Sequence, residues 1–255
     1  MTQNVHSVLK VQLSSKAQYV FETEVRKLSE PVYRHEYKHA INLLDYHALR
    51  QRIGAIARLD PNAGEDGRYH IRSLYFDNDD DQALREKIYG LPNREKYRIR
   101  IYNTGSDLIR LEKKSKANGL CSKQSASITK EQAERILIGD VGWMLHTENA
   151  VLTEFYGKMG YQRLRPKTIV DYWREAYIFP YGNVRITFDS DVRTGLYATG
   201  LFSKALPTFP VGEPGVLLLE VKYNEFLPDV VRDLIQTNTR RTAAFSKYAV
   251  SRIYG

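Results

Sequence analysis

The sequence has a single cysteine, Cys121, among its 255 residues. One cysteine excludes an internal disulfide and a cysteine-rich metal site. The chain also lacks the run of about 18 apolar residues that a membrane-spanning helix requires. Its first residues lack the apolar stretch of a secretion signal. We therefore expect a soluble, cytoplasmic protein without a membrane span.

Several ligand-binding motifs are missing as well. No Gly-x-x-x-x-Gly-Lys loop occurs, which excludes a P-loop enzyme. The acidic run at 77–81 lacks the glycine and glutamate of a calcium loop, because Gln82 and Ile88 occupy those positions. No recognised nucleic-acid signature accompanies the 18 tyrosines, so nucleic acid is the least favoured partner.

The composition indicates a globular protein with an anionic partner. Hydrophobic residues make up 42% of the chain, which is enough for a sizeable core. The formal net charge is +8. Such an excess favours nucleic acid, an acidic membrane or polyphosphate, and does not choose among them.

Basic residues recur at every second position in several predicted strands. In 95–102, Lys96, Arg98 and Arg100 share one face, and apolar side chains occupy the other. Residues 108–114 repeat the pattern. We expect strands at about residues 33–42, 69–77, 95–102, 108–114, 120–128, 168–177, 183–191 and 216–223. We expect helices from Asp45 to about Ile56 and over about 80–89, 129–138, 148–159, 229–237 and 245–253.

These elements predict a single α+β domain over residues 31–255, built around an antiparallel sheet or barrel, after an arm or helix at residues 1–30. Most antiparallel sheets expose their charged face to solvent, which is the first alternative. A closed barrel with helices on the outside could instead enclose the charged face. Buried like charges repel one another, so such a lumen would require an anion.

Three glutamates are candidate metal ligands. Glu220 follows three leucines, which indicates a buried strand. It could bind Mg²⁺ or Mn²⁺ together with phosphate oxygens, or it could form a structural ion pair. Glu112 could be a second ligand or could orient Arg98 or Arg100. Glu36 could be a third ligand or part of a cross-strand pair.

The best phosphate ligands are Arg98 and Arg100, because guanidinium groups bind phosphate through two hydrogen bonds. For any single lysine, a solvated side chain is the commoner outcome. Further candidates on other strands and on the last helix are Lys38, Lys114, Lys123, Arg174, Arg185, Ser246 and Lys247.

An ordered set of short motifs is similar to a known family. The motifs are Arg34-His-Glu-Tyr-Lys38, Ser73-Leu-Tyr-Phe-Asp77, Tyr97-Arg-Ile-Arg-Ile-Tyr102, Leu111-Glu-Lys-Lys114, Val184-Arg-Ile-Thr-Phe-Asp189, Leu219-Glu-Val-Lys222 and Phe245-Ser-Lys-Tyr248. Together they resemble the VTC domain, the polyphosphate polymerase domain of the triphosphate tunnel metalloenzymes in the CYTH-like superfamily. The resemblance covers roughly residues 31–255.

The resemblance implies an antiparallel tunnel barrel lined with basic residues, with helices packed on the outside. It implies transfer of the γ-phosphate of ATP to a growing polyphosphate chain, with Mn²⁺ or Mg²⁺ as cofactor. It matches Glu220 to the metal-binding glutamate, and Arg98, Arg100, Lys114 and Lys247 are the expected catalytic cations. The phosphate contacts that it implies are Lys38, Arg98, Arg100, Lys114, Lys123, Arg174, Arg185, Ser246 and Lys247.

The chain departs from the wider superfamily at one position. The hydrolase members begin with Glu-x-Glu-x-Lys, and Arg34 stands here in place of the first glutamate. This change favours the polymerase branch. A tunnel triphosphatase or polyphosphatase and a non-catalytic polyphosphate-binding module remain alternatives.

Overall fold

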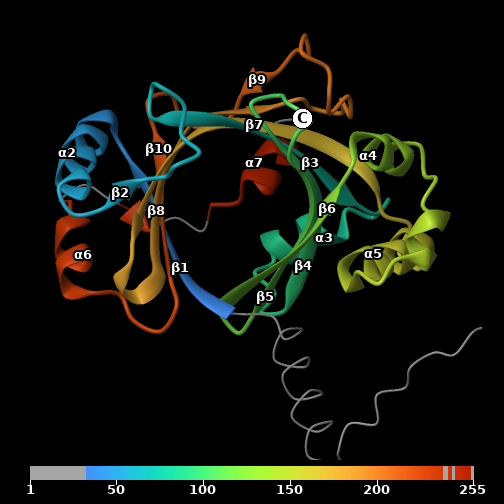
Figure 1. Cartoon of the computed structure of the whole chain (residues 1–255), viewed down its shortest axis with the longest axis horizontal. Helices are drawn as coiled ribbons and strands as arrows, with labels where there is room; N and C mark the ends of the chain where they lie inside the picture. Colours follow the sequence, from blue (N-terminus) through green and yellow to red (C-terminus); the bar gives the residue numbers. More distant parts are fainter. Residues whose placement is uncertain (1–32, 238–240, 243–244, 254–255) are drawn as a thin grey trace, which may run out of the picture. The chain divides into compact units, whose positions relative to one another are not determined.

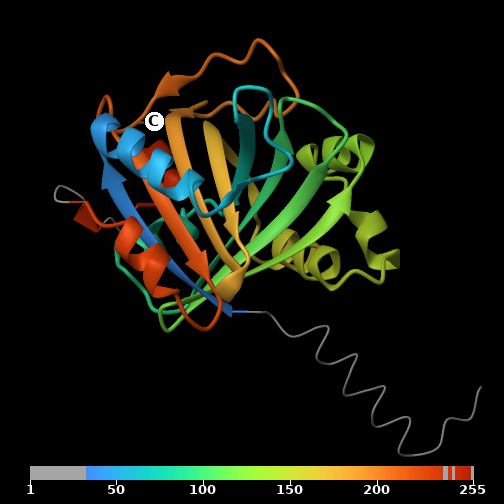
Figure 2. The same cartoon turned by 60° about the vertical axis from the view of Figure 1, so that its left-hand side comes forward.

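A computed structural model describes residues 33–237, 241–242 and 245–253. The predicted N-terminal arm or helix at residues 1–30 lies outside this part of the chain. Figure 1 views the domain down a barrel of strands, and Figure 2 views it after a rotation of 60°. Within the described residues, no helix has the length and apolar character needed to cross a bilayer.

Eight long strands close into an antiparallel barrel (Figure 1). They are β1 (Tyr33–Ile41), β3 (Arg68–Asp77), β4 (Arg94–Tyr102), β5 (Ile109–Ala117), β6 (Leu120–Ile128), β7 (Arg165–Phe179), β8 (Val184–Thr194) and β10 (Leu217–Tyr223). Around the barrel their order is β7-β3-β4-β5-β6-β1-β10-β8, and β8 pairs with β7 to complete the ring. Closure leaves these strands without a free long edge.

Three short strands add to this ring. They are β2 (Arg58–Leu59), β9 (Phe209–Pro210) and β11 (Arg241–Thr242). They pair with β7, β8 and β1, respectively. None of these three strands was expected from the sequence.

Helices cover two opposite sides of the barrel (Figures 1 and 2). On one side are α2 (Leu43–Gly54) and α6 (Asp229–Leu234), and on the other are α4 (Lys130–Leu137) and α5 (Ala150–Tyr161). The outward side chains of the strands and the apolar faces of these helices form two buried cores. The predicted barrel with external helices is confirmed, and burial of its outer apolar surface stabilises it.

Local signals explain where these helices begin. Thr129 and Gln132 form a capping box at the start of α4, with bonds of 2.9 and 3.1 Å. The helix α2 was expected to begin at Asp45, but it begins earlier, at Leu43. Asn42 is the N-cap, and its Oδ1 accepts a hydrogen bond of 2.8 Å from the backbone N–H of Asp45, which lies in the first turn.

The C-terminal helix α7 (Lys247–Ile253) lies within the ring of strands, unlike the outer helices (Figure 1). Tyr248 stacks on the lumen-facing Tyr75 with 5.1 Å between ring centroids. Its hydroxyl donates a hydrogen bond of 2.6 Å to Asp77, which also accepts backbone bonds from the start of α3 (Gln82–Ile88). Arg252 pairs with Asp81 at 2.8 Å. These contacts join α3 and α7 at one end of the barrel.

Candidate phosphate-binding tunnel

The predicted charged faces meet inside the barrel. Strand alternation puts Lys96, Arg98 and Arg100 on the inner face of β4, and register places Lys114 and Glu112 opposite the first two on β5. Ser246 and Lys247 reach this face from the start of α7. The remaining predicted phosphate ligands lie on strands and share the face; these residues are Lys38, Lys123, Arg174 and Arg185. The inner face therefore combines all of the predicted phosphate contacts.

Glu112 is the centre of the first charged cluster. It is only 1% exposed, and it accepts from Arg98 at 2.7 and 2.8 Å. Arg100 and Lys123 lie 3.6 and 3.3 Å from its other oxygen. Burial would raise the pKa of Glu112, but these three cations hold it well below its usual range. Of its two predicted roles, this geometry supports the orientation of the arginines.

Arg100 in this cluster keeps a donor that no described residue accepts. Arg98 also donates to the Tyr75 hydroxyl at 2.8 Å. Arg100 Nε, Ser73 Oγ and Thr187 Oγ1 are buried without a hydrogen-bond partner among the described residues. Ser73 is opposite Arg100 in the sheet, and Thr187 is opposite a lumen carboxylate. Buried donors of this kind require partners, and oxyanions can supply them.

Glu36 and Glu220 form the second cluster, on the neighbouring strands β1 and β10. Lys38 lies 3.0 Å from Glu36 and directly opposite Glu220 in the sheet. Lys114 lies 2.8 Å from Glu36, and Lys222 lies 2.7 Å from Glu220. Both glutamates therefore face the lumen, as predicted, and each is already paired with lysine.

Electrostatics keeps both of these carboxylates ionised. Burial and the nearby charge of Glu220 would raise the pKa of Glu36, but Lys114 and Lys38 lower it to about 2. Burial likewise opposes ionisation of Glu220, while Lys222 and Lys38 hold its pKa well below the usual range. The two neighbouring carboxylates can supply oxygen ligands for a divalent cation. Within the described residues, no group of three or more His, Cys, Asp or Glu side chains completes such a site.

Asp189 organises a third cluster that sequence reasoning missed. It is fully buried and accepts from Arg174 at 2.6 and 2.8 Å and from Lys247 at 2.5 Å. Tyr172 lies below both cations, with its ring centroid 5.3 Å from the Arg174 guanidinium and 4.6 Å from the Lys247 ammonium. The available signal was the alternation of β8, because Asp189 follows Thr187 on the same inward face.

Arg185 marks a different part of the lumen face. It is opposite Lys222 in the sheet and donates to Tyr69 Oη at 3.0 Å. It also pairs with Asp60, a nearly buried carboxylate that follows β2. Asp60 lies between a predicted helix and a predicted strand and was not a candidate site residue, so its pairing with Arg185 was not expected from the sequence.

A cavity of about 260 Å³ lies at the end of the tunnel where α3 and α7 meet. Glu36, Lys38, Lys96, Lys114 and Ser246 are among its lining residues. Lys96 is a site residue that the sequence reasoning did not select, although it had placed Lys96 on the charged face. Most of the charged side chains that line the cavity are cationic, so its shape and charge suit a phosphate group.

Two solved structures are similar to this chain. A Hippeastrum protein described as having a dominant triphosphatase activity aligns with a TM-score of 0.52 and 14% identity, over 87% of this chain and 96% of that chain. The triphosphatase of the Mimivirus capping enzyme aligns with a TM-score of 0.36 and 12% identity, over 88% and 99%. The first likeness supports the tunnel fold.

The family assignment comes from the sequence as a whole. A comparison with curated proteins gave no match. The model of the VTC domain matches residues 33–253, which include every strand of the closed barrel and the helix inside it. The chain belongs to the VTC domain family.

Proposed function

We propose that this protein transfers the γ-phosphate of ATP to the end of a growing inorganic polyphosphate chain inside the tunnel, in the cytoplasm. The convergence of the predicted cations on one closed lumen carries this proposal. Arg98, Arg100, Lys114 and Lys247 are the proposed catalytic cations. The proposed phosphate contacts are these four together with Lys38, Lys123, Arg174, Arg185 and Ser246.

The residues present fit an Mn²⁺ or Mg²⁺ cofactor. Mg²⁺ is commonly held by one or two carboxylates together with substrate phosphates. Glu36 and Glu220 supply two ionised carboxylates beside the phosphate-binding face. When bound, the metal would neutralise charge on adjacent phosphate oxygens. Glu112 already forms ion pairs with Arg98 and Arg100, so we assign the metal to Glu220 and Glu36.

The chain's own residues would position the reacting groups. A terminal oxygen of polyphosphate would bond to the γ-phosphorus, while the bond from that phosphorus to the β–γ bridging oxygen breaks and releases ADP. The attacking oxygen is already anionic, so no strong general base is required. Arg98 and Arg100 are held in place by Glu112 and can offer their free N–H groups to non-bridging oxygens.

A tunnel triphosphatase is the second candidate. The described triphosphatase activity of the Hippeastrum protein, which shares the fold, supports it. In this reaction water replaces the terminal phosphate as acceptor. Arg34 in the position of the first hydrolase glutamate favours transfer to phosphate instead.

Incubation of the purified protein with ATP and Mn²⁺, with and without a short polyphosphate primer, tests these proposals. We expect long-chain polyphosphate, detected by gel electrophoresis. Orthophosphate release without chain growth would support the triphosphatase. Tight, salt-sensitive polyphosphate binding without turnover, unchanged in Glu220→Ala, would support a binding module.

A further inference from the structure

Four cations form a square on the inner faces of two neighbouring strands. In the register of β4 and β5, Arg94 is opposite Lys116, and Lys96 is opposite Lys114. Like charges directly opposite each other destabilise a sheet. Lys114 has Glu36 at 2.8 Å. For the other three, no carboxylate of the described residues lies within 4.0 Å. This arrangement favours an anion that comes from outside the chain.

Lys96 occupies the inner corner of this square. Its Nζ lies 3.4 Å from Ser246 Oγ and 5.6 Å from the centroid of the Tyr75 ring. By contrast, the neighbouring lumen cations Arg98 and Lys114 have carboxylate partners. Lys96 is therefore a partly buried ammonium group that contacts a hydroxyl and an aromatic face and pairs with no carboxylate of the described residues. Such a group gains most from an incoming counter-ion.

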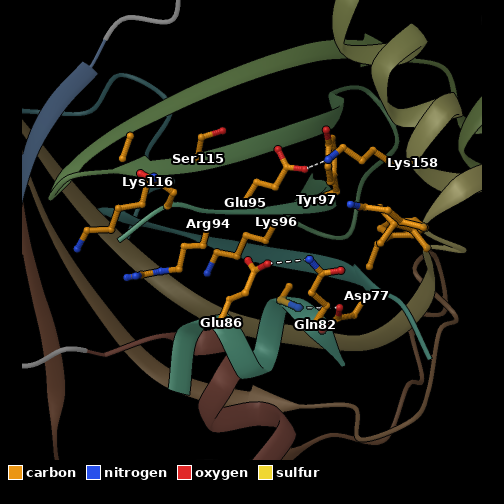
Figure 3. Close-up of a pocket in the computed structure, with 16 residues that line it drawn as sticks. Asp77, Gln82, Glu86, Arg94, Glu95, Lys96, Tyr97, Ser115, Lys116 and Lys158 are labelled. Carbon is orange, nitrogen blue, oxygen red and sulfur yellow. Dashed lines mark hydrogen bonds and ion pairs between the residues drawn. The ribbon is translucent and has the colours of Figure 1, made fainter. Parts of the chain in front are cut away.

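Two cavities adjoin at these cations. The tunnel cavity of about 260 Å³ and a neighbouring cavity of about 420 Å³ share Arg94, Lys96, Ser115 and Lys116 as lining residues. In the close-up of the larger cavity, Arg94, Lys96 and Lys116 extend away from Tyr97 and Lys158 on the outer side of the sheet (Figure 3). A phosphate chain that enters the tunnel at this end would pass these three side chains.

We propose that Lys96, flanked by Arg94 and Lys116 and faced by the Ser246 hydroxyl, binds a phosphate group of a linear triphosphate or polyphosphate at this mouth of the tunnel. The inference rests on the proposed function for its ligand class. It adds a phosphate-binding residue to the set that the family resemblance implies.

The protonation of Lys96 supplies a specific signature of this contact. Burial, together with the positive charges of Lys114, Lys38 and Arg98, lowers the pKa of Lys96 to about 7, and Tyr75 opposes this effect. The charged and titratable groups that surround it are Glu36 and Lys38 on β1, Tyr75 on β3, Arg94, Glu95 and Arg98 on β4, Lys114 and Lys116 on β5, Cys121 on β6, Lys87 on α3 and Tyr248 on α7.

The sign of the effect follows from the lowered pKa. Because the pKa of Lys96 is lowered to about 7, part of the free protein holds Lys96 neutral at pH 8, and a bound phosphate raises the pKa and restores the ammonium. At pH 8 Lys96 would then take up as much as about one proton on binding. Arginine at this position stays charged, so Lys96→Arg should bind without this uptake.

Isothermal titration of the full chain with tripolyphosphate, at pH 8 in buffers of different ionisation enthalpy, measures this uptake. We expect Lys96→Arg to take up measurably fewer protons than the wild type, with a difference of as much as about one proton. We also expect Lys96→Met to bind roughly tenfold more weakly than wild type at pH 6.5, where the lysine is charged. Circular dichroism establishes that each variant is folded.

Tyr75→Phe identifies the titrating group, because the pKa of Tyr75 is also lowered to about 7, by Arg98 and Lys96 against the effect of burial. Uptake that is retained in Tyr75→Phe and reduced in Lys96→Arg supports the proposal. Uptake in Lys96→Arg that equals the wild-type uptake, or unchanged affinity in Lys96→Met, overturns it. If these binding results hold but ATP yields no polyphosphate, the proposed polymerase function fails and the phosphate subsite stands.

Discussion

The Asp189→Asn substitution tests whether the cations of the tunnel depend on buried carboxylates. Asp189 is fully buried and holds Arg174 and Lys247 within 2.8 Å. Asparagine has nearly the same shape, but it lacks the negative charge. The substitution therefore leaves two buried cations without their shared partner, while the packing of β8 is preserved.

The expected cost follows from the burial of this cluster. Removing one partner of a buried ion pair costs about 3–5 kcal/mol. Asparagine retains one hydrogen-bond acceptor, so we expect a loss near the lower end, about 3 kcal/mol in the free energy of unfolding. For a domain of this size the midpoint of thermal unfolding should fall by about 6–12 °C.

Differential scanning calorimetry at neutral pH and low salt measures this shift, with Asp140→Asn as the control. Asp140 pairs with Arg135 at 2.7 Å on the surface, where the two side chains are 49% and 38% exposed. The control removes the same charge from an ion pair, and its unfolding midpoint should stay essentially unchanged. Tripolyphosphate should stabilise Asp189→Asn more than the wild type, because an anion replaces the missing charge.

Acid provides a second check on the same cluster. Burial opposes ionisation of Asp189, but Arg174 and Lys247 lower its pKa from 3.8 to about 2. Its contribution to stability is present above pH 3.8 and is lost as the pH falls through about 2. The difference between wild type and Asp189→Asn should therefore shrink over this range. An Asp189→Asn midpoint no lower than that of Asp140→Asn would refute the reasoning.

Three further substitutions test other parts of the site and fold. Glu220→Gln should reduce Mn²⁺-dependent turnover at least tenfold and tighten metal-free tripolyphosphate binding, because one anion leaves the cationic lumen; unchanged metal dependence would argue against a metal role. Arg98→Lys should lower turnover about tenfold in steady-state kinetics, since lysine cannot reproduce the two bonds of Arg98 to Glu112. Unaltered turnover would contradict this prediction. Tyr248→Phe should lower the free energy of unfolding by about 1–2 kcal/mol, measured by chemical denaturation, because it removes the hydrogen bond to Asp77. A variant as stable as the wild type would show that this hydrogen bond does not stabilise the domain.

The period-two patterns were a good guide to the barrel. Residues 95–102 and 120–128 form β4 and β6 almost at their expected bounds, because alternation gives each strand one face for the outer core and one for the lumen. β7 is longer than expected, from Arg165 to Phe179. Two-residue strands such as β9 carry too little periodicity to be recognised, and their pairing depends on tertiary neighbours.

The residues of the candidate site also differ in whether they could be predicted from the sequence. Arg98 and Arg100 were found because their spacing forces them onto one face of one strand. Asp189 was missed because its importance lies in the partners Arg174 and Lys247, which come from another strand and from the last helix. Long-range partners of this kind leave no local pattern in the sequence.

The sequence by itself determined the charged and apolar faces of the long strands, since successive side chains of a strand must point to opposite sides. Only the tertiary structure decided that the charged side is enclosed, through the pairing of β8 with β7 that closes the ring. It also decided which cations have carboxylate partners. Closure and α7 set the distances between side chains from different elements, and these distances, more than composition, govern the electrostatics of the lumen.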